Sequence, residues 1–198
     1  MTEQGADADR EPSSADIVDA SEDAPSDPVV SPDQRRRCLV VLGSVAVGAV
    51  VLDQLVKWWV VSALQPRLAS GEGPVVLLGG LLKFTYVENT GAAFSIGVGY
   101  TWIFTIVAVI VAAFILRTSR RLGSVGWAVA LGGLLGGLLG NLIDRLTRPP
   151  GPGLGYVVDF ISLPYFAVFN IADMFITLSA VGMVLLAVRG IEIGGRRS

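Results

Sequence analysis

The chain has 198 residues, of which 52% are hydrophobic and only 16% are charged, and its formal net charge is −2. A mean hydropathy of +0.62 lies well outside the range of ordinary soluble domains and indicates a membrane protein. The chain has no histidine, which excludes Ser-His-Asp and Cys-His nucleophile arrangements and nearly every zinc site built on imidazole.

The first 33 residues form a separate acidic segment. They carry ten acids and one base, a net charge of −9, whereas the rest of the chain carries 14 bases and 7 acids. The segment lacks the apolar residues needed to fold and lacks the basic start and apolar centre of a secretory signal. We expect residues 1–37 to be a disordered acidic tail ending in a basic cluster, 38–190 to form a membrane domain, and 191–198 to be a short basic C-terminus.

Four apolar segments are long enough to cross a bilayer, whose core of about 30 Å needs roughly 20 helical residues. They are residues 38–64, 95–116, 124–143 and 170–188. The single cysteine, Cys38, is expected to be a small buried hydrophobe. In the third segment Gly132, Gly136 and Gly140, with Gly133 and Gly137 beside them, have the spacing that allows close helix packing.

The distribution of basic residues predicts the orientation. Ten lie in the tail, in the turn at 117–123 and at the C-terminal end, against four in the connections 65–94 and 144–169. The positive-inside rule therefore predicts cytoplasmic termini and extracytoplasmic connections. Within the first connection, residues 74–78 and 83–88 have the character of short strands, which predicts a small β element on the outer surface.

Polar side chains gather at the outer end of the predicted bundle, where each is a functional candidate because charge is costly in a membrane. Asp53 and Lys57, at i and i+4, can form an ion pair on one helix face. Asp144 and Arg145 can be structural or act as interfacial anchors. The remaining polar candidates at this end are Glu88, Asn89, Asn141, Asp159 (in the loop after the third segment), Asn170 and Asp173.

Asp159 and Asp173 stand out because both lie in apolar surroundings and neither has a Lys or Arg within four residues. Two such carboxylates close together cannot easily both ionise. One ionised and one protonated carboxyl is the arrangement that an aspartic protease uses. From spacing alone, catalysis, ion or proton conduction and a purely structural role all remain open, as does a membrane scaffold assembled through the glycine-rich segment.

Five motifs in order closely resemble the bacterial lipoprotein signal peptidase family, also called signal peptidase II. They cover about residues 38–190 and comprise Asp53-x-x-x-Lys57, the run Glu88 to Ser95, the run Gly140 to Arg145, the run Val157 to Phe160, and the run Phe169 to Asp173. The tail, the Pro- and Gly-rich stretch 147–155 and Met174 depart from the family pattern.

The resemblance implies an intramembrane aspartic endopeptidase that removes signal peptides from diacylglyceryl-modified prolipoproteins, cutting before the lipid-bearing cysteine. It implies an all-α membrane protein of four transmembrane helices, with a small extracytoplasmic β-cradle and an interfacial helix, in the bacterial cytoplasmic membrane. Prolipoproteins and membrane lipid are the expected partners, with no cofactor, metal or nucleic acid, and the chain is expected to be a monomer. By the same resemblance Asp159 and Asp173 match the catalytic pair, and the supporting residues are Asn89, Gly91, Asn141, Asp144, Arg145, Asn170, Asp53 and Lys57.

Overall fold

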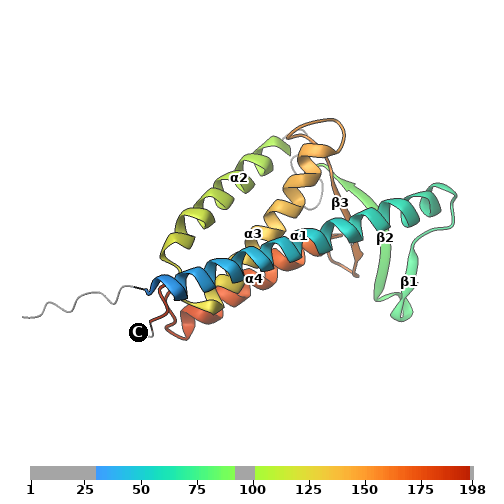
Figure 1. The fold of residues 1–198 in the computed structure, drawn as a ribbon. Helices are drawn as coiled ribbons and strands as arrows, with labels where there is room; N and C mark the ends of the chain where they lie inside the picture. The colour runs from blue at the N-terminus through green and yellow to red at the C-terminus, as the bar shows by residue number, and fades with distance from the viewer. Residues whose placement is uncertain (1–29, 92–100, 197–198) are drawn as a thin grey trace, which may run out of the picture.

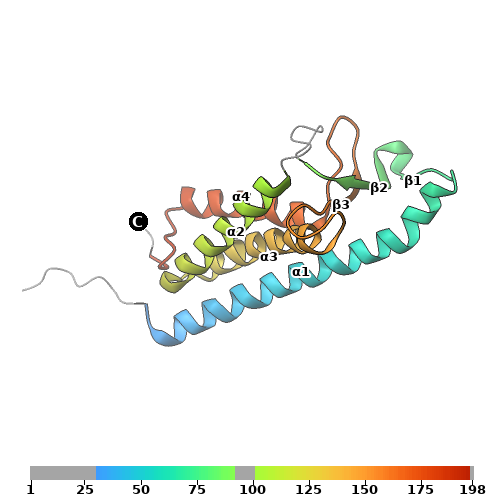
Figure 2. The ribbon, with the colours of Figure 1, turned by 90° about the horizontal axis from the view of Figure 1, so that it is seen from above.

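The computed structural model describes residues 30–91 and 101–196, which form four long helices and one three-stranded sheet (Figure 1 and Figure 2). The start of α1 and the end of α4 lie at one end of the helix bundle, and the sheet lies at the other. In chain order the elements are α1 (Pro32–Ala69), β1 (Val75–Leu77), η1 (Leu78–Gly80), β2 (Leu82–Asn89), α2 (Thr101–Thr118), η3 (Ser119–Arg121), α3 (Val125–Thr147), β3 (Val157–Ser162) and α4 (Ile171–Val188).

All four helices are long and apolar enough to cross a membrane, which confirms the predicted number of spans. Helix α1 has 38 residues, so it is about 57 Å long and extends well beyond a bilayer core. It begins at Pro32 because Ser31 caps it by accepting a hydrogen bond from the Gln34 amide, and proline is favoured in the first turn. The helix therefore begins six residues before the predicted apolar segment, and the basic cluster at 35–37 belongs to the helix.

The ends of the other helices differ less from their predicted positions. Helix α3 continues to Thr147, four residues beyond the predicted end, and α2 ends at Thr118 instead of residue 116. The first part of the predicted second segment, residues 95–100, lies outside the described residues. As predicted, Cys38 is a free and fully buried cysteine.

Helix α3 is the central helix, and its glycines let two neighbours approach closely. On one face, a Cβ added to Gly136 would lie 2.6 Å from Ala49 Cβ of α1. On another face, a Cβ added to Gly137 would lie 2.5 Å from the carbonyl oxygen of Ala172 in α4. Only glycine permits these distances, so the predicted close packing of the glycine-rich segment is confirmed.

The sheet is antiparallel in the order β1-β2-β3. The first two strands confirm the strand-like segments predicted in the 65–94 connection, but β3 was not predicted, and Asp159 lies on this strand instead of in a loop. A strand that is buried along its length shows no polar alternation to identify it. Residues 157–161 are all buried because β3 packs against Val60 and Leu64 near the end of α1.

The fold lacks one expected element within its described part. Residues 30–91 and 101–196 contain no separate interfacial α-helix, and η1, between β1 and β2, is a single 3₁₀ turn. That turn is formed by left-handed backbone at Gly79 and Gly80, with φ of 66° and 99°, a conformation that glycine adopts without steric cost. The long end of α1 and the sheet are the regular elements that extend beyond the bundle at this end.

Candidate active site

Asn170 connects the two candidate aspartates. It is the N-cap of α4, and its side-chain oxygen accepts a hydrogen bond of 3.0 Å from the Asp173 amide, while the Asp173 carboxylate accepts from the Asn170 amide. This reciprocal capping box fixes Asp173 in the first turn of the helix. The side-chain nitrogen of Asn170 donates to Asp159 Oδ1 at 2.6 Å. One buried amide side chain thus contacts both aspartates, which the structure brings together from β3 and α4.

Asp159 is held from the sheet side as well. Its second oxygen, Oδ2, accepts a 2.8 Å hydrogen bond from Asn89 Nδ2 at the end of β2. The oxygen of the same Asn89 amide accepts from the Gly91 amide, which fixes the side-chain orientation of Asn89. Asp159 is only 2% exposed, whereas Asp173 is partly exposed, so Asp173 is the more accessible carboxylate of the pair.

Asn141 joins α3 to this arrangement. Its nitrogen donates to Asp173 Oδ1 at 2.8 Å, and its oxygen accepts from both Asn170 Nδ2 and Lys57 Nζ. The Lys57 ammonium can only donate hydrogen bonds, so the side-chain oxygen of Asn141 must face it. The side-chain nitrogen of Asn141 then faces Asp173 and donates to it. The orientation of this amide therefore depends on a lysine in α1.

Lys57 is the centre of a buried charge cluster with Asp53 and Asp144, which we call the lysine cluster. Its Nζ lies 2.9 Å from a carboxylate oxygen of each, and all three side chains are almost fully buried. The i,i+4 ion pair predicted between Asp53 and Lys57 is confirmed. Asp144 is 0% exposed, so it is an internal residue and not an interfacial anchor.

Each acid of the lysine cluster also holds the backbone next to a candidate catalytic residue. Asp53 Oδ1 accepts from the amide of Ala172, which precedes Asp173. Asp144 Oδ2 accepts from the amide of Val158, which precedes Asp159. Lys57 thus sets the positions of both aspartates through two carboxylates, in addition to its contact with Asn141.

Arg145 lies near the aspartates but is held differently. Its Nη1 is 3.4 Å from the Asn141 carbonyl oxygen, and its guanidinium lies 5.7 Å from the centre of the Phe104 ring. Its buried Nε has no hydrogen-bond partner among the described residues. The side chain as a whole is partly exposed and interacts electrostatically with Asp173 and Asp159, so its remaining guanidinium N–H groups suit a role in binding a substrate oxygen.

The residue that sequence reasoning missed is Arg148. It lies 2.9 Å from Asp144 Oδ1 through Nε and supplies the second cation for that carboxylate. Its i,i+4 spacing from Asp144 was the available signal. Gly155 was also missed, although a Cβ there would lie 2.6 Å from the Arg148 carbonyl oxygen, so the loop before β3 requires glycine to pack against the end of α3.

Burial raises the pKa of Asp159 to about 6, and the negative charge of Asp173 adds to this effect. The hydrogen bonds from Asn89 and Asn170 favour the ionised form but do not offset burial. Asp159 is therefore a carboxyl group that changes protonation near neutral pH, which suits proton transfer in catalysis.

This raised pKa predicts a stability change with pH. The folded state binds the Asp159 proton more tightly than the unfolded chain, so stability should fall as pH rises from about 4 to 6, by about 3 kcal/mol, and then level off. Thermal unfolding in one detergent at pH 5 and pH 8 measures the upper part of this change, about 1 kcal/mol, because stability has already partly fallen at pH 5. The Asp159→Asn variant should lose this part of the pH dependence, and an unchanged pH dependence in that variant would contradict the prediction.

The matching family model and two relatives of known name agree on one family. The family model for signal peptidase (SPase) II matches residues 45–189. The chain is 48% identical to the lipoprotein signal peptidase of Leifsonia xyli over 80% of this chain and 72% of the relative. It is 39% identical to that of Streptomyces coelicolor over 96% and 97%. A solved structure of a bacterial membrane enzyme is 27% identical, with a TM-score of 0.61 over 73% of this chain and 85% of the other.

Proposed function

The chain belongs to the signal peptidase II family and removes signal peptides from prolipoproteins, and we propose that Asp159 and Asp173 are the catalytic carboxylates. The observation that carries this assignment is the position of Asn170, whose amide contacts the Asp159 carboxylate and the Asp173 backbone at once. Two carboxylates held around one amide at a helix N-terminus, one of them with a pKa near neutrality, suit an aspartic peptidase.

In the proposed mechanism, one carboxylate removes a proton from water while the other carboxyl, still protonated, polarises the scissile carbonyl group. The water oxygen then attacks the carbonyl carbon, and the proton held by the base is passed to the leaving amine. Asn89, Asn141 and Asn170 hold the pair, while Arg145 offers a donor to the substrate backbone. Hydrolysis is direct in this mechanism, because the chain has no histidine to activate a serine or cysteine and the buried Lys57 ammonium is bound by the two acids of the lysine cluster and by Asn141.

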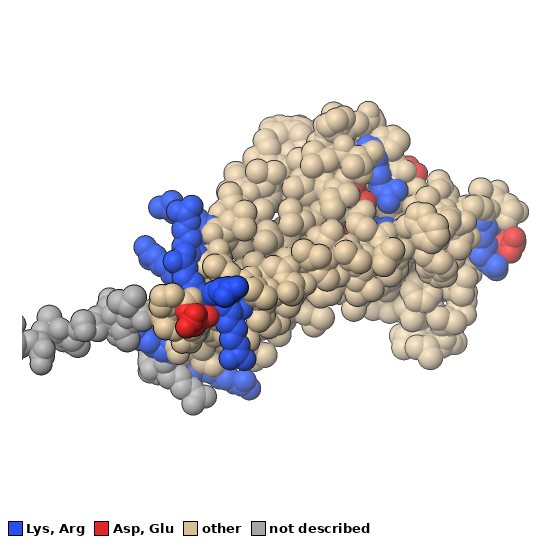
Figure 3. Space-filling model, in the orientation of Figure 1, with Lys and Arg blue, Asp and Glu red and all other residues tan. Residues whose placement is uncertain are grey.

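The orientation of the membrane domain is part of the proposal. Most of the described basic residues lie at the end that carries the start of α1 and the end of α4, and fewer lie toward the sheet (Figure 3). By the positive-inside rule this end faces the cytoplasm, and the aspartate pair lies near the extracytoplasmic face. A lipid-bearing cysteine at the outer membrane surface would then reach the pair while its acyl chains stay in the bilayer.

Proton or ion conduction by the same carboxylates is less well supported. The buried core of the opposite half of the bundle is apolar and includes Leu42, Ala46, Ile115, Leu131 and Leu135. A conducting protein needs polar groups through the depth of the membrane. The buried charged residues Asp53, Lys57, Asp144 and Asp159 lie together at the other end, as hydrolysis near the membrane surface requires.

The proposal is tested with the purified chain and a prolipoprotein carrying the diacylglyceryl group on its cysteine. We expect cleavage directly before that cysteine, identified by mass spectrometry of the released signal peptide. The matched control is the same precursor without its diacylglyceryl group, which should be cut far more slowly. Equal rates on the two precursors would show that the lipid is not recognised. Cleavage at another peptide bond would contradict the proposed cleavage position.

A further inference from the structure

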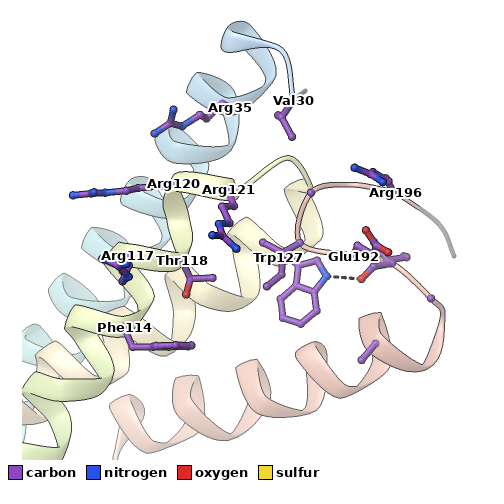
Figure 4. A pocket seen from close by; sticks show the side chains of 15 residues that line it. Val30, Arg35, Phe114, Arg117, Thr118, Arg120, Arg121, Trp127, Glu192 and Arg196 are labelled. Carbon is purple, nitrogen blue, oxygen red and sulfur yellow. Dashed lines mark hydrogen bonds between the residues drawn. The ribbon is translucent and has the colours of Figure 1, made fainter. Parts of the chain in front are cut away.

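The end of the bundle opposite the sheet holds a cavity of about 1130 Å³ (Figure 4), which we call the arginine cavity. It lies between the start of α1, the turn joining α2 to α3, and the C-terminal segment after α4. Five arginines line it: Arg35, Arg117, Arg120, Arg121 and Arg196. Glu192 is the one acidic residue among those that line it.

Four of the arginines that line the cavity form no ion pair with another described residue. Within residues 30–91 and 101–196, no salt bridge to a carboxylate is found for Arg35, Arg117, Arg120 or Arg121. These residues come from α1, the end of α2 and η3, so separate elements of the fold supply the arginines that line the cavity. Orientation of a membrane protein requires basic residues near its cytoplasmic face but does not require that they share a cavity.

The wall of the cavity is fixed and partly apolar. The Ile193 carbonyl oxygen accepts hydrogen bonds from the amides of Gly123 and Ser124, and Trp127 Nε1 donates to the Ile191 carbonyl oxygen at 2.7 Å. The C-terminal segment is thereby tied to the α2–α3 turn. Trp127 and the exposed ring of Phe114 provide an apolar surface beside the arginines.

We propose that the arginine cavity binds the headgroup of an anionic phospholipid from the leaflet at this end of the bundle. Guanidinium groups donate paired hydrogen bonds to phosphate oxygens, and an acyl chain would lie along Phe114 on the lipid-facing side of α2. Basic pockets between membrane helices are suited to such headgroups. The site is at the opposite end of the bundle from Asp159 and Asp173, so it is independent of the proposed catalytic assignment.

The test measures lipid binding to the full chain by native mass spectrometry, with phosphatidylglycerol and phosphatidylcholine added in turn. We expect phosphatidylglycerol to bind at least about tenfold more tightly, and the double variant Arg117→Gln/Arg121→Gln to lose about tenfold in affinity for it. The matched control is Arg36→Gln/Arg37→Gln. It removes two charges at the same end of the molecule from residues that do not line the cavity, and it should lose less than about threefold.

Three outcomes would overturn the proposal. Equal losses in the two double variants would show general surface attraction without a site. Displacement of the lipid by millimolar inorganic phosphate would assign the cavity to soluble anions. A preference for phosphatidylglycerol that emerges only when Glu22, Asp23 and Asp27 are changed to amides would assign it to the acidic N-terminal segment of the chain itself. In each case, an unchanged cleavage rate shows that the variants are folded.

Discussion

Replacing either Asp159 or Asp173 by asparagine is expected to lower the cleavage rate by about a thousandfold or more, because an amide can neither take a proton from water nor donate an acidic one. Asparagine has nearly the shape of aspartate, so the loss would reflect chemistry more than packing. At position 173 its side-chain oxygen can still accept from the Asn170 amide, which preserves the helix cap. The rate is measured on the lipidated precursor at saturating substrate.

A matched control separates loss of chemistry from loss of a charge. Glu72 is an exposed acid that pairs with Arg67 near the end of α1, and Glu72→Gln should cleave at the wild-type rate. Thermal unfolding of the two aspartate variants shows whether they are folded. If both folded variants cleave at the wild-type rate, the catalytic assignment is wrong. If only one does, the reaction uses a single carboxylate and the two-aspartate mechanism fails.

The membrane helices could be predicted because a bilayer imposes a length and an apolar composition on each span. The ends of the helices could not, since they are set by local contacts that composition does not reveal. Helix α1 starts six residues early because Ser31 caps it, and it continues past the predicted end to Ala69, where Ser70 forms the C-cap. The strand β3 was not predicted for a different reason. Burial on both faces removes the alternation of polar and apolar residues that identifies a strand in the sequence.

For the site, the positions of charged residues in apolar segments were sufficient to nominate a group of residues that the structure brings together. The orientation derived from arginines predicted that Asp53, Asp144, Asp159 and Asp173 would lie at one level, and the hydrogen bonds confirm that they are connected. Which of these side chains contact one another could not be predicted. Nothing in the spacing shows that Lys57 contacts Asp144 as well as Asp53, because that contact depends on the close approach of α1 and α3 at Gly136 and Gly140.

Replacing Lys57 by methionine is expected to destabilise the protein by about 3–5 kcal/mol, because it leaves two buried carboxylates facing each other with one cation, Arg148, in place of two. It should also lower cleavage strongly in any protein that still folds, since the Asn141 amide would lose the donor that fixes its orientation. Thermal unfolding measures the first effect, and the rate on the lipidated precursor measures the second. The chain's other lysine, Lys83 in β2, is exposed, and Lys83→Met is the matched control that should change neither.

A compensating variant decides whether Lys57 acts through charge. In Lys57→Met/Asp53→Asn the lysine cluster loses one cation and one anion, while the asparagine oxygen can still accept from the Ala172 amide. We expect the double variant to be more stable than Lys57→Met alone, because the excess buried negative charge is removed. Its cleavage rate should remain low, because nothing replaces the Lys57 ammonium at the Asn141 oxygen. If stability and activity recovered together, Lys57 would be only a counterion; if stability recovered alone, Lys57 would be a positioning residue that acts through Asn141.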